Sequence, residues 1–196
     1  RYFVLLVDGI YQTPKLAKDV SAALLDGKPV DIDSDIKNID VSDIREKLNP
    51  SHSKCDLTVR ITDKIYDENV LTLIHRDLYI GVGCKKNTDI KKMQNFIYQV
   101  FRDEGLDIRA IKAVGSIDIK KDERAIVELS NSLSVPFYTF TKDELKKVEG
   151  EFNESDFVKE TVGVGNVCER AVLIQCDNFV LKKTAKDEMT VAIGRS

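Results

Sequence analysis

The sequence has few of the residues that bind metals or form disulfides. Among 196 residues there are four cysteines and two histidines, and the cysteines form no C-x-x-C pair. His52 and His75 do not complete a zinc-ligand spacing with them. A disulfide framework is typical of short, cysteine-rich secreted chains, so this pattern indicates reduced thiols. The sequence therefore predicts no metal site in the protein and a cytoplasmic location.

A long hydrophobic run and an excess of positive charge are also lacking. No apolar stretch reaches the about 18 residues that a membrane-spanning helix needs, and no signal peptide is visible. The 30 Lys and Arg residues face 33 Asp and Glu residues, which gives a net charge of −3. Proteins that bind nucleic acid normally carry a basic surface. We therefore expect neither a membrane nor a nucleic acid as partner.

What the sequence does contain is a regular alternation of strand-length apolar runs and amphipathic helical segments. Strands are predicted at residues 2–7, 28–33, 56–63, 78–84, 108–116, 135–140, 178–184 and 189–195. Helices are predicted at 14–27, 41–48, 90–105, 122–133, 142–150 and 167–176, with caps at Ser42, at Thr88 or Asp89, and at Thr141. This alternation is typical of a layered α/β protein.

The residues 49–54, "NPSHSK", are rich in turn formers and divide the pattern. We expect two α/β lobes with a break between about Asn49 and Leu78. The C-terminal domain should hold a mixed five-stranded sheet flanked by helices, because its last two strands are typical of a hairpin at one edge.

Three polar, glycine-containing turns follow strands of the second half: Gly81–Lys86, Val114–Asp118 and Gly163–Glu169. Parallel strands place their carboxyl ends at one edge, where ligands of open α/β sheets bind. We therefore expect these turns to converge. The candidate binding residues in them are Gly81, Gly83, Cys84, Lys85, Lys86, Gly115, Ser116, Gly163, Gly165 and Asn166.

The turns do not fit a nucleotide-binding motif. A G-x-G-x-x-G fingerprint fails because Lys86 and Cys168 stand at the third glycine position, and no phosphate loop of the G-x-x-x-x-G-K-[ST] type is present. Glycines at helix starts, with Lys85 and Lys86 beside them, favour an anion. The same residues are equally compatible with ordinary strand–helix turns and solvated lysines.

Two kinds of side chain near this edge could take part in a reaction. Cys84 and Cys168 precede or begin helices, where a thiol pKa falls, but no histidine base is identifiable and a packing role is favoured. The carboxylates that could act as a general base are Asp118, Asp122, Glu123 and Glu169. Asp122 and Glu123 are equally typical of a first helical turn.

Four blocks of the second half, in this order, resemble the C-terminal domain of the CbiG family of cobalamin-biosynthesis proteins. They are "YIGVGCKKNTDIKKM", "AVGSIDIKKDERAIVELSNSLSVPFYTFTKDEL", "VGVGNVCERAVL" and "MTVAIGR". The resemblance covers residues 78–196, and residues 1–77 are similar to part of the N-terminal α/β domain with a bridging segment. The family's N-terminal glycine–histidine turn is replaced here by "DGIYQTP", and Lys85 stands where arginine is usual.

The resemblance implies a cobalt-precorrin-5A hydrolase of anaerobic cobalamin biosynthesis. Such an enzyme opens a δ-lactone on the tetrapyrrole and releases acetaldehyde, and so acts on a carbon–carbon bond. No cofactor is expected, because the cobalt arrives within the corrinoid substrate. The resemblance is also compatible with two kinds of protein partner, namely other enzymes of the pathway or a second copy of the chain. The alternatives are a non-catalytic corrinoid-binding module and, least favoured, an unrelated anion-binding protein.

On this interpretation the three turns and Arg170 bind the carboxylates of the substrate. Asp118 or Glu169 serves as the base that activates water. Backbone N–H groups at Gly83–Lys85 or at Gly165–Val167 stabilise the oxyanion.

Overall fold

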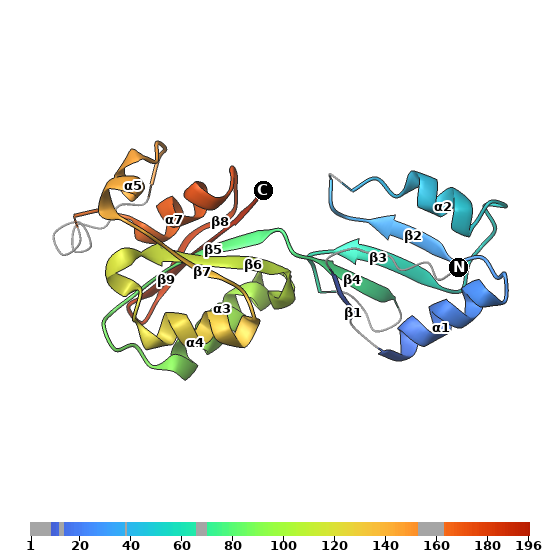
Figure 1. The fold of residues 1–196 in the computed structure, drawn as a ribbon, viewed down its shortest axis with the longest axis horizontal. Coiled ribbons are helices and arrows are strands. Elements are labelled where there is room, and N and C mark those ends of the chain that lie inside the picture. The colour runs from blue at the N-terminus through green and yellow to red at the C-terminus, as the bar shows by residue number, and fades with distance from the viewer. Residues whose placement is uncertain (1–8, 12–13, 38, 66–69, 153–162) are drawn as a thin grey trace. The chain divides into compact units, whose positions relative to one another are not determined.

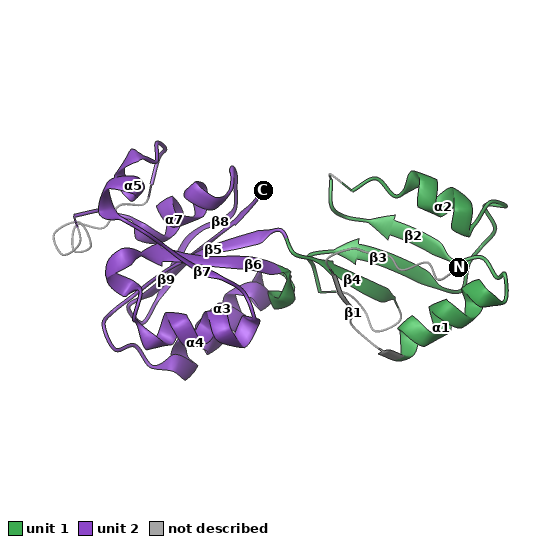
Figure 2. Cartoon of the chain, in the orientation of Figure 1, with its two compact units in different colours: residues 1–76, 105–110 green, residues 77–104, 111–196 purple. Residues whose placement is uncertain are grey.

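The computed structural model describes residues 9–11, 14–37, 39–65, 70–152 and 163–196 (Figure 1). The chain divides into two compact units (Figure 2): unit 1 comprises residues 1–76 and 105–110, and unit 2 comprises residues 77–104 and 111–196. The strand expected at residues 2–7 lies outside the described residues. Within the described ranges, no helix is both long enough and apolar enough to span a membrane.

Unit 1 is built on a four-stranded sheet in the order β1-β4-β3-β2. Its strands are β1 (Gly9–Tyr11), β2 (Asp31–Ser34), β3 (Thr58–Thr62) and β4 (Leu71–His75). Strands β2, β3 and β4 are parallel, and β1 pairs antiparallel with β4. The strand β4 was not among the predicted elements. Residues 49–54 form a loop within this unit, since β3 and β4 follow it.

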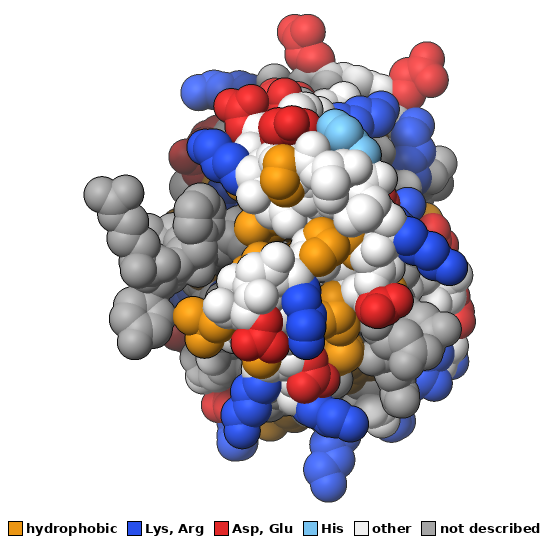
Figure 3. All heavy atoms as spheres, turned by 90° about the vertical axis from the view of Figure 1, so that its right-hand side faces the viewer, with side chains coloured by type: hydrophobic (Ala, Val, Ile, Leu, Met, Phe, Trp, Pro, Cys, Tyr) orange, Lys and Arg blue, Asp and Glu red, His pale blue; other side chains and the backbone are white. Residues whose placement is uncertain are grey.

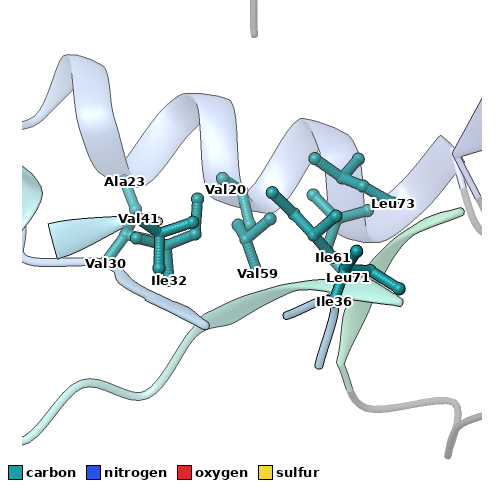
Figure 4. Packing of buried hydrophobic residues seen from close by; sticks show 10 residues of the cluster. All are labelled: Val20, Ala23, Val30, Ile32, Ile36, Val41, Val59, Ile61, Leu71 and Leu73. Carbon is teal, nitrogen blue, oxygen red and sulfur yellow. The ribbon is translucent and has the colours of Figure 1, made fainter. Parts of the chain in front are cut away.

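The core of unit 1 lies on one face of this sheet (Figure 4). The pairing aligns Ile32 with Val59, and Val59 with Leu71, so these side chains share that face. Helix α1 (Pro14–Leu25) contributes Val20 and Ala23 to the same cluster. Burying such a continuous apolar face supplies the main driving force for folding the unit.

Helix α2 (Ser42–Leu48) corrects one prediction. Its N-cap is Val41, and Ser42 is its first helical residue rather than its cap. Asp40 instead accepts hydrogen bonds from the N–H and the hydroxyl group of Ser42, which lowers the pKa of Asp40. An acidic side chain just before a helix is stabilised by the exposed N–H groups there.

Unit 2 contains the expected mixed five-stranded sheet, in the order β7-β6-β5-β9-β8. The strands are β5 (Leu78–Cys84), β6 (Ile111–Ile117), β7 (Phe137–Phe140), β8 (Asn178–Lys186) and β9 (Met189–Arg195). Strands β5, β6 and β7 are parallel. Strand β9 pairs antiparallel with β5 and with β8, so the predicted hairpin at one edge is confirmed.

Helices cover both faces of this sheet (Figure 1). Helices α3 (Ile90–Asp103) and α4 (Arg124–Leu133) pack against each other on one face, and α7 (Val167–Gln175) lies on the other, over β5, β6 and β9. Asp89 caps α3, and Thr141 forms a capping box with Glu144 at α5 (Lys142–Lys147), as the sequence predicts. The fold is therefore the layered α/β arrangement expected.

Candidate functional site

The first two polar turns lie together at the carboxyl ends of β5 and β6. The two strands are parallel, with Gly81 aligned with Gly115. The hydroxyl of Ser116 donates to the carbonyl of Val82 at 2.7 Å. Beyond the strand ends, the N–H of Asn87 donates to the Glu123 carboxylate at 3.2 Å. These bonds join the two turns into one edge.

The third turn, Gly163–Glu169, leads into α7, and α7 packs against the sheet. Glycines in β5, β6 and β9 allow this helix to approach closely. A Cβ atom on Gly81 would lie 1.9 Å from the backbone oxygen of Cys168, and one on Gly115 would lie 2.3 Å from the Gln175 amide nitrogen. A Cβ on Gly194 would be 2.4 Å from Val172. These glycines therefore form a flat floor for α7, whose atoms occupy the space beside them.

The remaining glycines of the three turns have different surroundings. A Cβ on Gly83 would lie 2.6 Å from the Thr190 hydroxyl, and Gly165 is buried. Gly163 has φ +75°, and the ammonium group of Lys142 lies 2.0 Å from the position of its absent Cβ. The backbone angle favours glycine here, whereas the exposed Lys142 side chain could move away from an added Cβ. Sequence analysis did not single out Lys142, although it follows the carboxyl end of β7 by two residues.

The cysteines near this edge are poor nucleophiles. Burial raises the pKa of the Cys84 thiol, although a hydrogen bond with Thr88 and the charge of Lys120 act against the rise. Burial raises the pKa of Cys168 to about 11, and the charge of Glu169 adds to the increase. A thiol reacts as its thiolate, so both side chains are predominantly unreactive at neutral pH. This favours the packing role.

Glu169 is fully buried and holds α7 to β8. One of its carboxylate oxygens accepts a hydrogen bond from the Asn166 amide at 2.6 Å, and the other accepts from the Lys183 N–H at 2.8 Å. Asn166 also caps α7, because its side-chain oxygen accepts from the N–H of Glu169. A buried carboxylate with both oxygens engaged is a structural group, and its geometry does not favour a base that activates water.

Arg170 is likewise engaged within the fold. Its Nη1 donates to the carbonyl oxygens of Leu145 at 3.2 Å and Val148 at 2.8 Å, at the end of α5. Its guanidinium group also lies over the Phe152 ring, 4.1 Å from the ring centre. The side chain thus supplies a donor to the Val148 carbonyl and a second one to the Leu145 carbonyl, which also accepts from the Val148 N–H.

Two of the sequence-predicted side chains remain available at the edge. Asp118 begins a short 3-10 turn (Asp118–Lys120) after β6 and is partly exposed. Lys86 is exposed. Within the described part of the chain, neither side chain makes a hydrogen bond or an ion pair. Lys85, by contrast, forms an ion pair with Glu188 at 3.1 Å.

Unit 1 also has a hollow on its surface. A hollow of about 560 Å³ in unit 1 is lined by polar side chains, including Arg45, Lys54 and Cys55, but Arg45 is already paired with Asp31 and Asp33. The described ranges contain no group of three or more His, Cys, Asp and Glu residues suited to a metal ion. On the face drawn in Figure 3, basic and acidic side chains are interspersed.

Comparison with known proteins places unit 2 in a described family. The family model of the Cobalamin synthesis G C-terminus matches residues 78–194. The cobalt-precorrin-5A hydrolase of Salmonella typhimurium is 32% identical over 123 residues, which are 62% of this chain and 35% of the relative. A probable cobalt-precorrin-5A hydrolase of Methanocaldococcus jannaschii is 25% identical over 127 residues, covering 59% of this chain and 39% of the relative. The chain therefore spans little more than a third of these relatives.

Two solved structures share the fold. CobE, a protein from the cobalamin biosynthetic pathway, has a TM-score of 0.57 and 21% identity over 61% of this chain and 89% of its own. A putative cobalamin biosynthesis protein G homolog from Sulfolobus solfataricus has a TM-score of 0.51 and 19% identity, and covers 95% of this chain and 57% of its own. Because the family model matches more than half of the sequence, from the first strand of unit 2 to the last, the chain belongs to the family of the cobalamin synthesis protein G C-terminus.

Proposed function

We propose that this chain acts in cobalt-precorrin-5A hydrolysis during cobalamin biosynthesis. The observation that carries the proposal is its 32% identity with a relative named for that activity. In the reaction, water adds to the lactone carbonyl and the ring C–O bond breaks, which leaves a carboxylate and a secondary alcohol. The alcohol then loses its proton as the bond to the macrocycle breaks. Acetaldehyde leaves, and the macrocycle carbon takes up a proton.

The carboxyl edge of β5 and β6 suits the first step of this reaction. Asp118 is partly exposed and carries no internal partner within the described ranges, so it can accept a proton from water. Lys86 is available to bind the acetate or propionate groups of the substrate. Of the two oxyanion sites considered, Gly83–Lys85 is weakened because the Lys85 N–H already donates to the Glu188 carbonyl at 3.3 Å. The N–H groups of Gly165–Val167 remain the candidates.

A non-catalytic corrinoid-binding module is the second candidate. The observation that favours it is the likeness to CobE, because a part of this chain, 61% of its length, covers 89% of the CobE chain. In that case the carboxyl edge would hold a corrinoid without opening the lactone.

The test is to incubate the chain with cobalt-precorrin-5A and to measure acetaldehyde. A hydrolase releases one acetaldehyde for each substrate consumed, and heat-denatured protein releases none. Corrinoid binding without acetaldehyde would reject the hydrolase proposal and support the binding module. Absence of both binding and turnover would reject the two candidates together.

The two lysines of the first turn are expected to differ in their effect on binding. Lys86→Ala should weaken corrinoid affinity by about 1.4- to 5-fold, the range for an exposed ion pair, and more strongly at low salt. Lys85→Ala should have a smaller effect, because Glu188 already neutralises that ammonium group. Titration of each variant, followed by the corrin absorbance, measures the difference. Equal losses would show that the Lys85–Glu188 pair does not matter for binding.

A further inference from the structure

The turn that joins β8 to β9 contains a glutamate where glycine would be favoured. Asp187 has φ +48° and Glu188 has φ +62°, so both residues are in the left-handed region. Two-residue hairpin turns of this kind prefer glycine at the second position, because a side chain there is strained. Retaining Glu188 therefore lowers stability relative to glycine at the same place.

The position of Glu188 places its carboxylate at the candidate site. Met189 is paired with Cys84, so the tip of the hairpin lies beside the end of β5. The carbonyl of Glu188 accepts from the N–H of Lys85 at 3.3 Å, and its carboxylate lies 3.1 Å from the Lys85 ammonium group. Both side chains are about two-thirds exposed, at 68% for Lys85 and 67% for Glu188.

The ion pair alone does not account for this residue. Exposed ion pairs of this kind add little to the free energy of unfolding, and salt weakens them. The steric cost of a left-handed backbone at a non-glycine residue does not depend on salt. Strained residues that persist without a gain in stability are concentrated at functional sites. The carboxylate of Glu188 is therefore better explained by an effect on Lys85 than by an effect on folding.

We infer that Glu188 determines the specificity of the site by occupying Lys85 with an internal carboxylate. An outside anion reaches Lys85 only by displacing Glu188. A small anion with one carboxylate gains too little from that exchange, whereas a ligand with several carboxylates is held near the lysine by its other contacts. The inference deepens the proposed function and rests on it, because it takes the carboxyl edge as the corrinoid-binding site.

The decisive variant is Glu188→Gln, which keeps the shape and removes the charge. Its affinity for cobyrinic acid, a cobalt corrinoid with free carboxylates, should rise by about 1.4- to 5-fold, as measured by absorbance titration. Acetate, tested as a competitor, should displace cobyrinic acid more effectively from Glu188→Gln than from the unchanged protein. In a Lys85→Ala background, Glu188→Gln should change neither measurement.

Asp187→Asn is the matched control, since it removes one negative charge from the same turn, whereas the ion pair with Lys85 is made by Glu188. It should leave both measurements close to those of the unchanged protein. Glu188→Gly should raise the melting temperature and strengthen binding as Glu188→Gln does. The inference is overturned if Glu188→Gln weakens binding, if Asp187→Asn has the same effect, or if the effect persists without Lys85. None of these measurements depends on acetaldehyde release, so failure of the hydrolase proposal is detected separately.

Discussion

Asp118→Asn is expected to lower the rate of acetaldehyde release by about 10²–10⁴-fold, the usual effect of removing a general base. The affinity for the corrinoid should stay close to that of the unchanged protein, because asparagine keeps the size and hydrogen-bonding capacity of the side chain. Of the two candidate bases, Asp118 is partly exposed and can reach water, whereas Glu169 is buried. Single-turnover measurements with cobalt-precorrin-5A separate the chemical step from binding.

Glu169→Gln is the matched control for Asp118→Asn, since both exchange a carboxylate for an amide. The amide nitrogen would face one of the two donors that now bond to Glu169, the Asn166 amide or the Lys183 N–H. A buried polar group without a suitable partner costs about 1–3 kcal/mol. We therefore expect a lower melting temperature, with turnover of the folded fraction retained. If Asp118→Asn keeps full turnover, Asp118 is not the base, whatever the family of the chain.

The sequence predicted the elements whose signals are local. Asp89 and Thr141 cap their helices as expected, because a cap depends on residues within one helical turn. The mixed sheet of unit 2 followed from the strand–helix alternation and the final hairpin. Ser42 failed as a cap because the helix already begins at Ser42, and its hydroxyl group donates to the Asp40 carboxylate, two residues earlier.

The features that the sequence missed depend on contacts between distant residues. Residues 105–110 belong to unit 1, where the N–H of Asp107 donates to the carbonyl of Asp63. The sequence around either residue does not predict this pairing, because the two residues are far apart in the chain. The same holds for the candidate site. Glu169 and Arg170 stand at a helix start and resemble ligand-binding residues, but their partners lie on β8 and at the end of α5. The sequence can predict that a charged residue lies at the edge of the sheet. Only the packed structure shows whether that charge is free to bind a ligand or is already paired within the protein.

The glycines of β5 illustrate the same limit and lead to the largest expected effect on stability. Gly81→Ala should destabilise the protein by about 3 kcal/mol, at the upper end of the range for overpacking a close-packed interior. The added methyl group would lie 1.9 Å from the Cys168 backbone oxygen, and backbone cannot rotate away as a side chain can. Helix α7 would have to move off β5 and β6. For a chain of this length the melting temperature should fall by roughly 6–12 °C, as measured by thermal unfolding.

Gly83→Ala is the matched control, because Gly83 lies two residues further along the same strand and faces the same side. Its methyl group would meet only the Thr190 hydroxyl, at 2.6 Å, and that side chain can turn to another rotamer. We therefore expect a clearly smaller loss of stability than for Gly81→Ala. Equal losses at the two positions would mean that any side chain on this face disrupts β5, and that close approach of α7 is not the reason for Gly81. A large loss at Gly81 alone would show that Gly81 is needed for the packing of α7 on the sheet. Ligand binding at this edge would then depend on residues that follow Gly81 in the chain.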